Sequence, residues 1–72
     1  MSKRIELEIV GMSCDNCVRH VKEALEGIRG VQSATVDLKE GHATVEAEPR
    51  VITEHLIEAV EEAGYQARVA GN

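Results

Sequence analysis

Two cysteines three positions apart are the residues of this 72-residue sequence best suited to chemistry. Cys14 and Cys17 enclose only Asp15 and Asn16. A disulfide gains stability by closing a long loop, so a pair this close is typical of reactive chemistry or metal ligation rather than of a structural staple. Two soft thiolates with no further ligand nearby favour an ion that tolerates low coordination, and they prefer Cu(I) to hard cations. The pair therefore predicts a soft-metal site.

Structural zinc fits this sequence less well. A structural zinc ion normally takes four ligands, and the cysteine pair supplies only two. Completing the set would require His20, His42 or His55 to converge on the pair. The sequence places His42 in an expected hairpin and His55 on an expected second helix, and it leaves His20 as a solvated residue. We therefore do not expect a structural zinc ion.

The segments on either side of the pair form a strand followed by a helix. Residues 3–10 alternate between apolar and charged side chains, which indicates a strand with one buried side. Gly11 ends this pattern, and Ser13 or Asp15 is expected to cap the helix that follows. Cys17 then falls in the first helical turn, where the positive end of the helix macrodipole stabilises a thiolate and lowers its pKa.

The rest of the chain continues with the alternation typical of strands and the spacing of three and four residues typical of helices. Two β-prone runs separated by a glycine-containing turn predict an antiparallel hairpin, and Thr53 is expected to cap a second helix that stops at Gly64. The remaining expected strands cover residues 31–38, 43–48 and 65–70. The order βαββαβ predicts an α+β fold with two helices on one face of a four-stranded antiparallel sheet. We expect a single domain over residues 1–72.

Composition restricts the classes of partner. Thirteen Asp and Glu residues against eight Lys and Arg give a formal net charge of −5, which argues against nucleic acid or an anionic membrane surface as a partner. The N-terminal residues run directly into a strand pattern without an apolar signal segment, and no later run approaches membrane-spanning length. We expect a cytoplasmic protein, without membrane insertion, whose two thiols are reduced.

Charged residues also suggest a docking surface. Arg19 and Lys22, together with Lys3 and Arg4, are expected to form a basic patch near the metal end of the domain. Such charges are usually a solvated face. We hypothesise that the patch steers docking to an acidic surface of a target domain.

The cysteine segment resembles a known family. The pattern GMxCxxC is complete at Gly11, Met12, Cys14 and Cys17, and it resembles the heavy-metal-associated domains of bacterial cytosolic copper chaperones and of copper-transporting P-type ATPases. The late pair formed by Gly64 and Tyr65 also looks like the family's loop beside the metal. The resemblance implies a ferredoxin-like fold in which Cys14 and Cys17 hold Cu(I) almost linearly. It further implies an outer shell made of Met12, Ser13 and Tyr65.

The same resemblance implies a function without catalysis. The chain is expected to be a metallochaperone that carries Cu(I) and passes it, by exchange of thiolate ligands, to the metal-binding domain of a copper-transporting P-type ATPase. It is expected to be a monomer when metal-free, and the family also implies a copper-bridged dimer. No enzymatic activity is expected.

Three alternatives stay open. The first is an N-terminal metal-binding domain of a heavy-metal P-type ATPase, although such domains more often carry Phe at the position of Tyr65. The second is a mercury-binding or zinc-binding homologue. Zinc-type domains often have an acidic residue where this chain has Ser13. The periplasmic mercury-binding proteins share the GMxCxxC motif but are made with an N-terminal signal peptide. The third is a thiol oxidoreductase, which normally needs a cis-proline facing its cysteines, whereas Pro49 follows the third strand.

Overall fold

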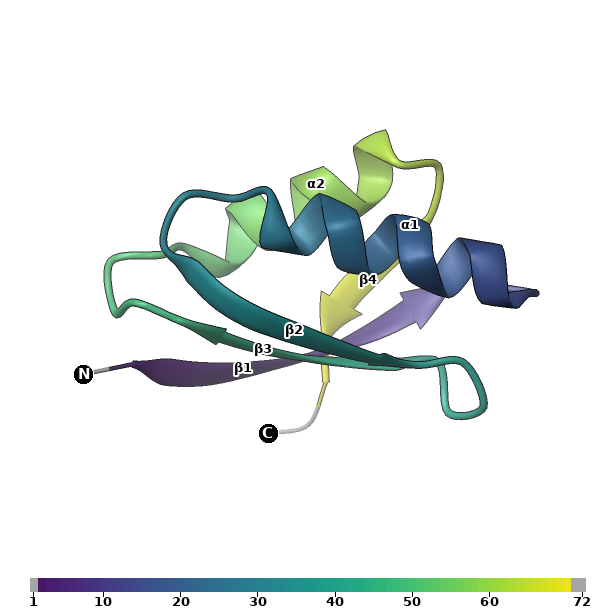
Figure 1. Cartoon of the computed structure of the whole chain (residues 1–72), viewed down its shortest axis with the longest axis horizontal. Helices are drawn as coiled ribbons and strands as arrows, with labels where there is room; N and C mark the ends of the chain where they lie inside the picture. Colours follow the sequence, from purple (N-terminus) through teal and green to yellow (C-terminus); the bar gives the residue numbers. More distant parts are fainter. Residues whose placement is uncertain (1, 71–72) are drawn as a thin grey trace.

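The chain alternates strands and helices in the order βαββαβ (Figure 1). The structure is a computed structural model and describes residues 2–70. Its elements are β1 (Lys3–Val10), α1 (Asp15–Glu26), β2 (Val31–Asp37), β3 (His42–Ala47), α2 (Thr53–Glu62) and β4 (Gln66–Val69). The fold class and element order expected from the sequence are confirmed.

The four strands form one antiparallel sheet in the order β2-β3-β1-β4. β1 is central, and Leu7 stands opposite Ala43 of β3 on one side and Val69 of β4 on the other. Both helices pack on the same face of the sheet (Figure 1). The turn from β1 into α1 therefore lies at one end of the sheet, close to the β2–β3 hairpin, and this end is called the metal-loop end below.

The core between helices and sheet is entirely aliphatic. The inward residues of β1 and β3 meet Val21 and Leu25 of α1 and Leu56 and Val60 of α2. Of these, Leu7, Leu25 and Leu56 are the largest fully buried side chains. A sequence without Phe or Trp can fill this layer because Ala34, Ala43 and Ala47 let the helices approach the sheet closely.

Both helices begin differently from the expectation. The N-cap of α1 is Cys14 and that of α2 is Ile52, and neither makes a side-chain capping hydrogen bond. The expected caps at Ser13, Asp15 and Thr53 are therefore wrong. Cys14 and Ile52 have extended backbone angles, and those angles decide where each helix starts. Neither helix, at 12 and 10 residues, is long and apolar enough to cross a membrane.

The expected basic patch is also wrong in part. β1 has eight residues, and at about 3.3 Å per residue its first residues lie on the order of 20 Å from the turn into α1. Lys3 and Arg4 are therefore at the opposite end of the molecule from the metal-loop end (Figure 1). Arg4 instead pairs with Glu46 of β3 across 3.7 Å. Only Arg19 and Lys22 remain near the cysteines, on α1.

Candidate metal centre

The cysteine loop connects β1 to α1. After Val10 the chain turns at Gly11, whose φ of 104° lies in a region that L side chains rarely adopt. The carbonyl of Cys14 then accepts hydrogen bonds from the backbone N–H groups of Cys17 at 3.0 Å and Val18 at 3.2 Å. These two bonds close the first turn of α1 and hold both cysteines at its start. The loop is thus fixed by backbone groups.

The two sulfur atoms converge above the start of α1. The Sγ atoms of Cys14 and Cys17 lie 3.2 Å apart, and both cysteines are free thiols. Cys14 is exposed, whereas Cys17 is half-buried. Both thiols therefore face one accessible point, and an ion can approach them from solvent without rearrangement of the core.

The loop lowers the pKa of the Cys17 thiol. Its pKa is lowered from 9.0 to about 6, chiefly by a hydrogen bond with the backbone of Ser13, and further by the Tyr65 hydroxyl and the Cys14 thiol. Partial burial opposes this change by disfavouring the charged form. At neutral pH Cys17 is therefore mainly a thiolate, which is the form that binds metal.

The other site residues predicted from the sequence surround the pair in different ways. Met12 is half-buried and packs against the aliphatic core. Ser13 is exposed and acts on Cys17 through its backbone. Tyr65 precedes β4, packs against the core, and directs its hydroxyl to Cys17, which raises the pKa of the phenol. The family resemblance pointed to Tyr65, but the link between Ser13 and Cys17 has no signal in the sequence.

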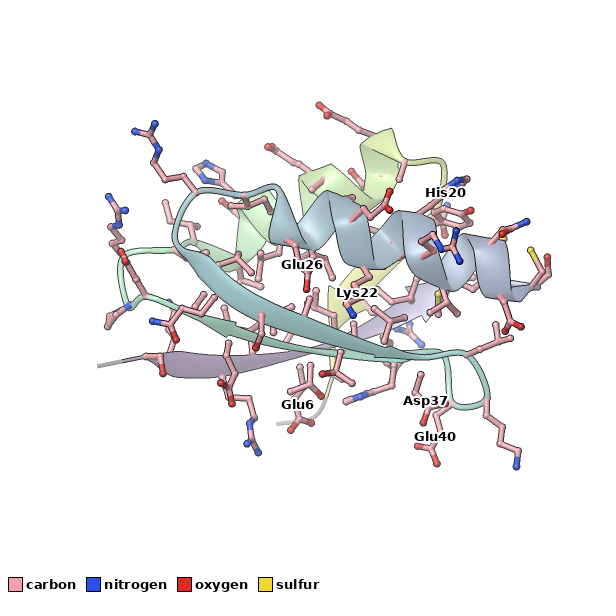
Figure 2. All side chains as sticks on the ribbon, in the orientation of Figure 1. Glu6, His20, Lys22, Glu26, Asp37 and Glu40 are labelled. Carbon is pink, nitrogen blue, oxygen red and sulfur yellow. The ribbon has the colours of Figure 1, made fainter. Side chains whose placement is uncertain are left out.

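The histidines are spread over the fold. His42 is the first residue of β3, and its Nε2 lies 3.3 Å from Glu6 on the sheet face that carries no helix. His55 is in α2, whereas His20 is on α1 near the metal-loop end (Figure 2). Within residues 2–70, no three side chains of His, Cys, Asp or Glu are gathered closely enough to hold a metal ion. The cysteine pair is thus the candidate metal site that the fold leaves, without a histidine beside it in the described part of the chain to complete a zinc set.

A βαββαβ domain with two converging thiols at its first strand-to-helix turn defines a class of small metal-binding proteins. The sequence profile of the heavy-metal-associated domain family matches residues 6–66, which include the cysteine loop and both helices. The chain belongs to this family.

Relatives of the chain include proteins named for copper and for mercury. It is 41% identical over 69 residues to the copper chaperone CopZ of Staphylococcus epidermidis, covering 94% of this chain and 100% of that protein. It is 47% identical over 64 residues to the mercuric reductase of Serratia marcescens, covering 89% of this chain. The chain spans only 14% of the length of that reductase.

A solved domain agrees with the copper group. The N-terminal domain of a potential copper-translocating P-type ATPase from Bacillus subtilis, determined in its Cu(I)-loaded state, superimposes with a TM-score of 0.92. The two sequences are 33% identical, and the alignment covers 99% of this chain and 90% of that domain. Proteins similar to this chain thus include free chaperones and domains of larger transporters.

Proposed function

We propose that the chain is a cytosolic metallochaperone that binds one Cu(I) ion between the thiolates of Cys14 and Cys17 and transfers it to the metal-binding domain of a copper-transporting P-type ATPase. The observation that carries the proposal is the separation of 3.2 Å between two free sulfurs, one of them ionised at neutral pH. The CopZ relative, which matches over its whole length, supports the chaperone assignment.

The donor set favours Cu(I) over other biological ions. Cu(I) is soft and accepts two thiolates, whereas structural zinc takes four ligands and hard cations take oxygen. With two sulfurs and no third ligand gathered within residues 2–70, the site suits an ion of low coordination number. The low pKa of Cys17 helps binding because less energy is needed to remove its proton.

Transfer follows from the exposure of Cys14. An incoming thiol of the partner loses its proton and bonds to the ion, which becomes three-coordinate. The bond to one of the chain's own sulfurs then breaks, and the released thiolate takes up a proton. The exposed position of Cys14 lets a partner reach the ion from that side, while Cys17 is half-buried. The ion keeps its oxidation state, and no step requires catalysis by the chain.

Each of the three residues of the expected outer shell has its own role. Ser13 and Tyr65 stabilise the Cys17 thiolate, and Met12 anchors the loop to the core.

The chain is a monomer when metal-free, and a copper-bridged dimer forms when two copies supply thiolates to one ion.

The decisive experiment is an anaerobic titration of the reduced chain with Cu(I) against a competing chelator. The wild-type chain is expected to bind one ion tightly, and Cys14→Ser or Cys17→Ser is expected to abolish that binding. Asn16→Ser is a matched control, because it changes an exposed residue between the cysteines and leaves both sulfurs. Retention of tight binding by either cysteine variant would overturn the two-thiolate site.

Mercury is the second candidate cargo, because the chain matches mercuric reductases as well as CopZ. Two thiolates in near-linear arrangement also suit Hg(II), which is softer than zinc. Under this reading the chain would collect Hg(II) and pass it to a reductase. Competition between Cu(I) and Hg(II) in the presence of a physiological thiol, followed by transfer to each type of acceptor, separates the two functions.

A further inference from the structure

The two sulfurs of the cysteine loop are close enough to react with each other. The Sγ atoms of Cys14 and Cys17 are 3.2 Å apart, and both residues are free thiols. Sulfurs in a disulfide are about 2.05 Å apart, so closing the bond requires them to approach by roughly 1 Å. Both residues belong to the start of α1, so no distant segment has to move. The geometry of the pair therefore suits an internal disulfide as well as a bound ion.

Cys14 is the residue that is free to make this movement. It is the N-cap of α1, its backbone is extended, and it is exposed. Cys17 lies inside the first helical turn, where its N–H donates to the Cys14 carbonyl at 3.0 Å. Rotation about the Cα–Cβ bond of Cys14 moves its sulfur without breaking a helical hydrogen bond. Closure of the disulfide is therefore expected to leave α1 intact.

The unequal exposure of the two sulfurs sets the order of reaction with an external disulfide. A molecule arriving from solvent reaches exposed Cys14 first, whereas Cys17 is half-buried. Cys17 is also the sulfur that the loop keeps as a thiolate, through its hydrogen bonds with the Ser13 backbone and the Tyr65 hydroxyl, which lower its pKa. A thiolate beside a mixed disulfide is the arrangement that resolves it. Cys14 is thus the entry sulfur and Cys17 the resolving sulfur.

We propose that the metal-free pair reacts with low-molecular-weight disulfides, such as glutathione disulfide, to form a Cys14–Cys17 disulfide that cannot hold a metal ion. This activity goes beyond the proposed function but uses the same two sulfurs. The balance of thiol and disulfide around the chain then sets the fraction of chains that can load metal.

The reaction consists of two exchange steps. In the first, Cys14 loses its proton and its sulfur bonds to one sulfur of the external disulfide. The S–S bond of that molecule breaks, and the released thiolate takes up a proton. In the second, the Cys17 thiolate bonds to the Cys14 sulfur, and the other half of the external molecule leaves as a thiolate that is protonated by water. The two cysteines lose two electrons together, and the external disulfide is reduced to two thiols.

The disulfide is a reversible state rather than a structural staple. The ring that it closes contains only Asp15 and Asn16 between the cysteines, and a loop this short gains little stability from closure. A reducing thiol also reaches the exposed Cys14 side of the bond. An excess of thiol is therefore expected to restore both cysteines.

The test incubates the reduced, metal-free chain with a large excess of glutathione disulfide in the absence of oxygen. Free thiols are counted after acid quenching, and the mass of the chain is measured. The wild-type chain should lose two thiols and the mass of two hydrogens, and excess glutathione should restore both. A chain loaded with one Cu(I) should react many-fold more slowly. Persistence of both free thiols in the metal-free chain would overturn the proposal.

The order of the two steps is tested with single variants. Cys17→Ser should accumulate the mixed disulfide of glutathione on Cys14, because the resolving sulfur is absent. Cys14→Ser should react several-fold more slowly, because its remaining sulfur is half-buried. Asn16→Ser is the matched control: it changes an exposed residue inside the ring, keeps both sulfurs, and should react like the wild-type chain. Faster trapping of glutathione on Cys17 than on Cys14 would overturn the assigned order.

Two further measurements complete the test. The oxidised chain should keep its helical circular dichroism, and loss of that signal would contradict closure without movement of α1. Cu(I) stoichiometry is measured separately by the chelator titration. A chain that binds one Cu(I) but resists glutathione disulfide keeps the proposed function and loses this inference. A chain that forms the disulfide but binds no Cu(I) when reduced loses the proposed function and keeps the exchange activity.

Discussion

Tyr65 directs its hydroxyl at the sulfur of Cys17, although 47 positions of sequence separate the two residues. The contact lowers the pKa of the Cys17 thiol and raises the pKa of the Tyr65 phenol, as expected when a neutral donor stabilises a neighbouring anion. The tyrosine ring also borders Gly11, where an added Cβ would lie 3.5 Å from its Cδ1. Tyr65 thus touches the loop at its start and at its reactive end.

Replacing Tyr65 by Phe should raise the pKa of Cys17 from about 6 toward its ordinary value, because one of the hydrogen bonds to the thiolate is lost. The hydrogen bond with the Ser13 backbone is the larger cause and remains, so the return should be partial. Ultraviolet thiolate absorbance as a function of pH measures the change. The phenylalanine ring keeps the packing against the core, so the unfolding midpoint should be nearly unchanged. An unaltered thiol titration would contradict the assigned contact.

The stability of the reduced, metal-free chain should depend on pH through Cys17. Its folded-state pKa of about 6 lies below its ordinary value of 9.0, so between these values the unfolded chain binds more protons than the folded chain. The free energy of unfolding should therefore rise as the pH increases through this window, and this contribution is lost as the pH falls through about 6. Urea unfolding across the window, compared with Cys17→Ser, isolates the effect. Identical pH dependence in both chains would rule it out.

The strands and helices follow from local patterns, which explains why the sequence predicts them well. β1 is predicted in full. β2 ends one residue earlier than expected, whereas β3 and β4 differ by one residue at both ends, as for β3, which covers His42–Ala47 rather than 43–48. The alternation of apolar residues in strands and their spacing in helices show which side chains face the core. Both patterns depend on residues that are close in sequence. A helix cap depends instead on the backbone angles of one residue, so Cys14 was missed in favour of its neighbours.

The site is predicted in its ligands but not in its surroundings. Two cysteines three positions apart carry their own signal, and the family resemblance pointed to Tyr65. The backbone contact between Ser13 and Cys17 depends on how the loop turns, and residue types do not encode it. Lys3 and Arg4 were placed wrongly because charge alone does not show that β1 carries them to the far end.

Shortening a buried side chain should remove most of the free energy of unfolding of a chain of this size. Leu56 is fully buried between α2 and the sheet, and Leu56→Ala is expected to cost about 2–5 kcal/mol. A core in a domain this small rarely supplies more than about 3–5 kcal/mol in total. The variant should therefore lose most of its cooperative unfolding transition, as followed by circular dichroism. Val69→Ala, at a site that is 57% exposed, should remain folded; equal stability of the two variants would contradict the packing.

Gly11→Ala should strain the cysteine loop directly. The φ of 104° at Gly11 disfavours any residue with a Cβ, at a cost of about 1–3 kcal/mol. The Cβ itself would meet Tyr65 at 3.5 Å, an ordinary contact, so the cost comes from the backbone rather than from crowding. Gly27→Ala is the control for the backbone, because Gly27 ends α1 with a helical φ of −75°; its added Cβ would meet the Glu23 carbonyl oxygen at 3.3 Å, so its cost comes from a contact and not from φ.

Two measurements separate strain in the loop from general destabilisation. Urea unfolding should show a lower free energy of unfolding for Gly11→Ala than for Gly27→Ala. If the loop relaxes by moving away from Tyr65, the pKa of Cys17 should also rise, because the hydroxyl then no longer reaches the thiolate. Gly27→Ala lies at the opposite end of α1 and should leave that pKa unchanged. Equal stability of both glycine variants would mean that the turn at Gly11 tolerates a side chain, which would contradict the strain assigned to its φ.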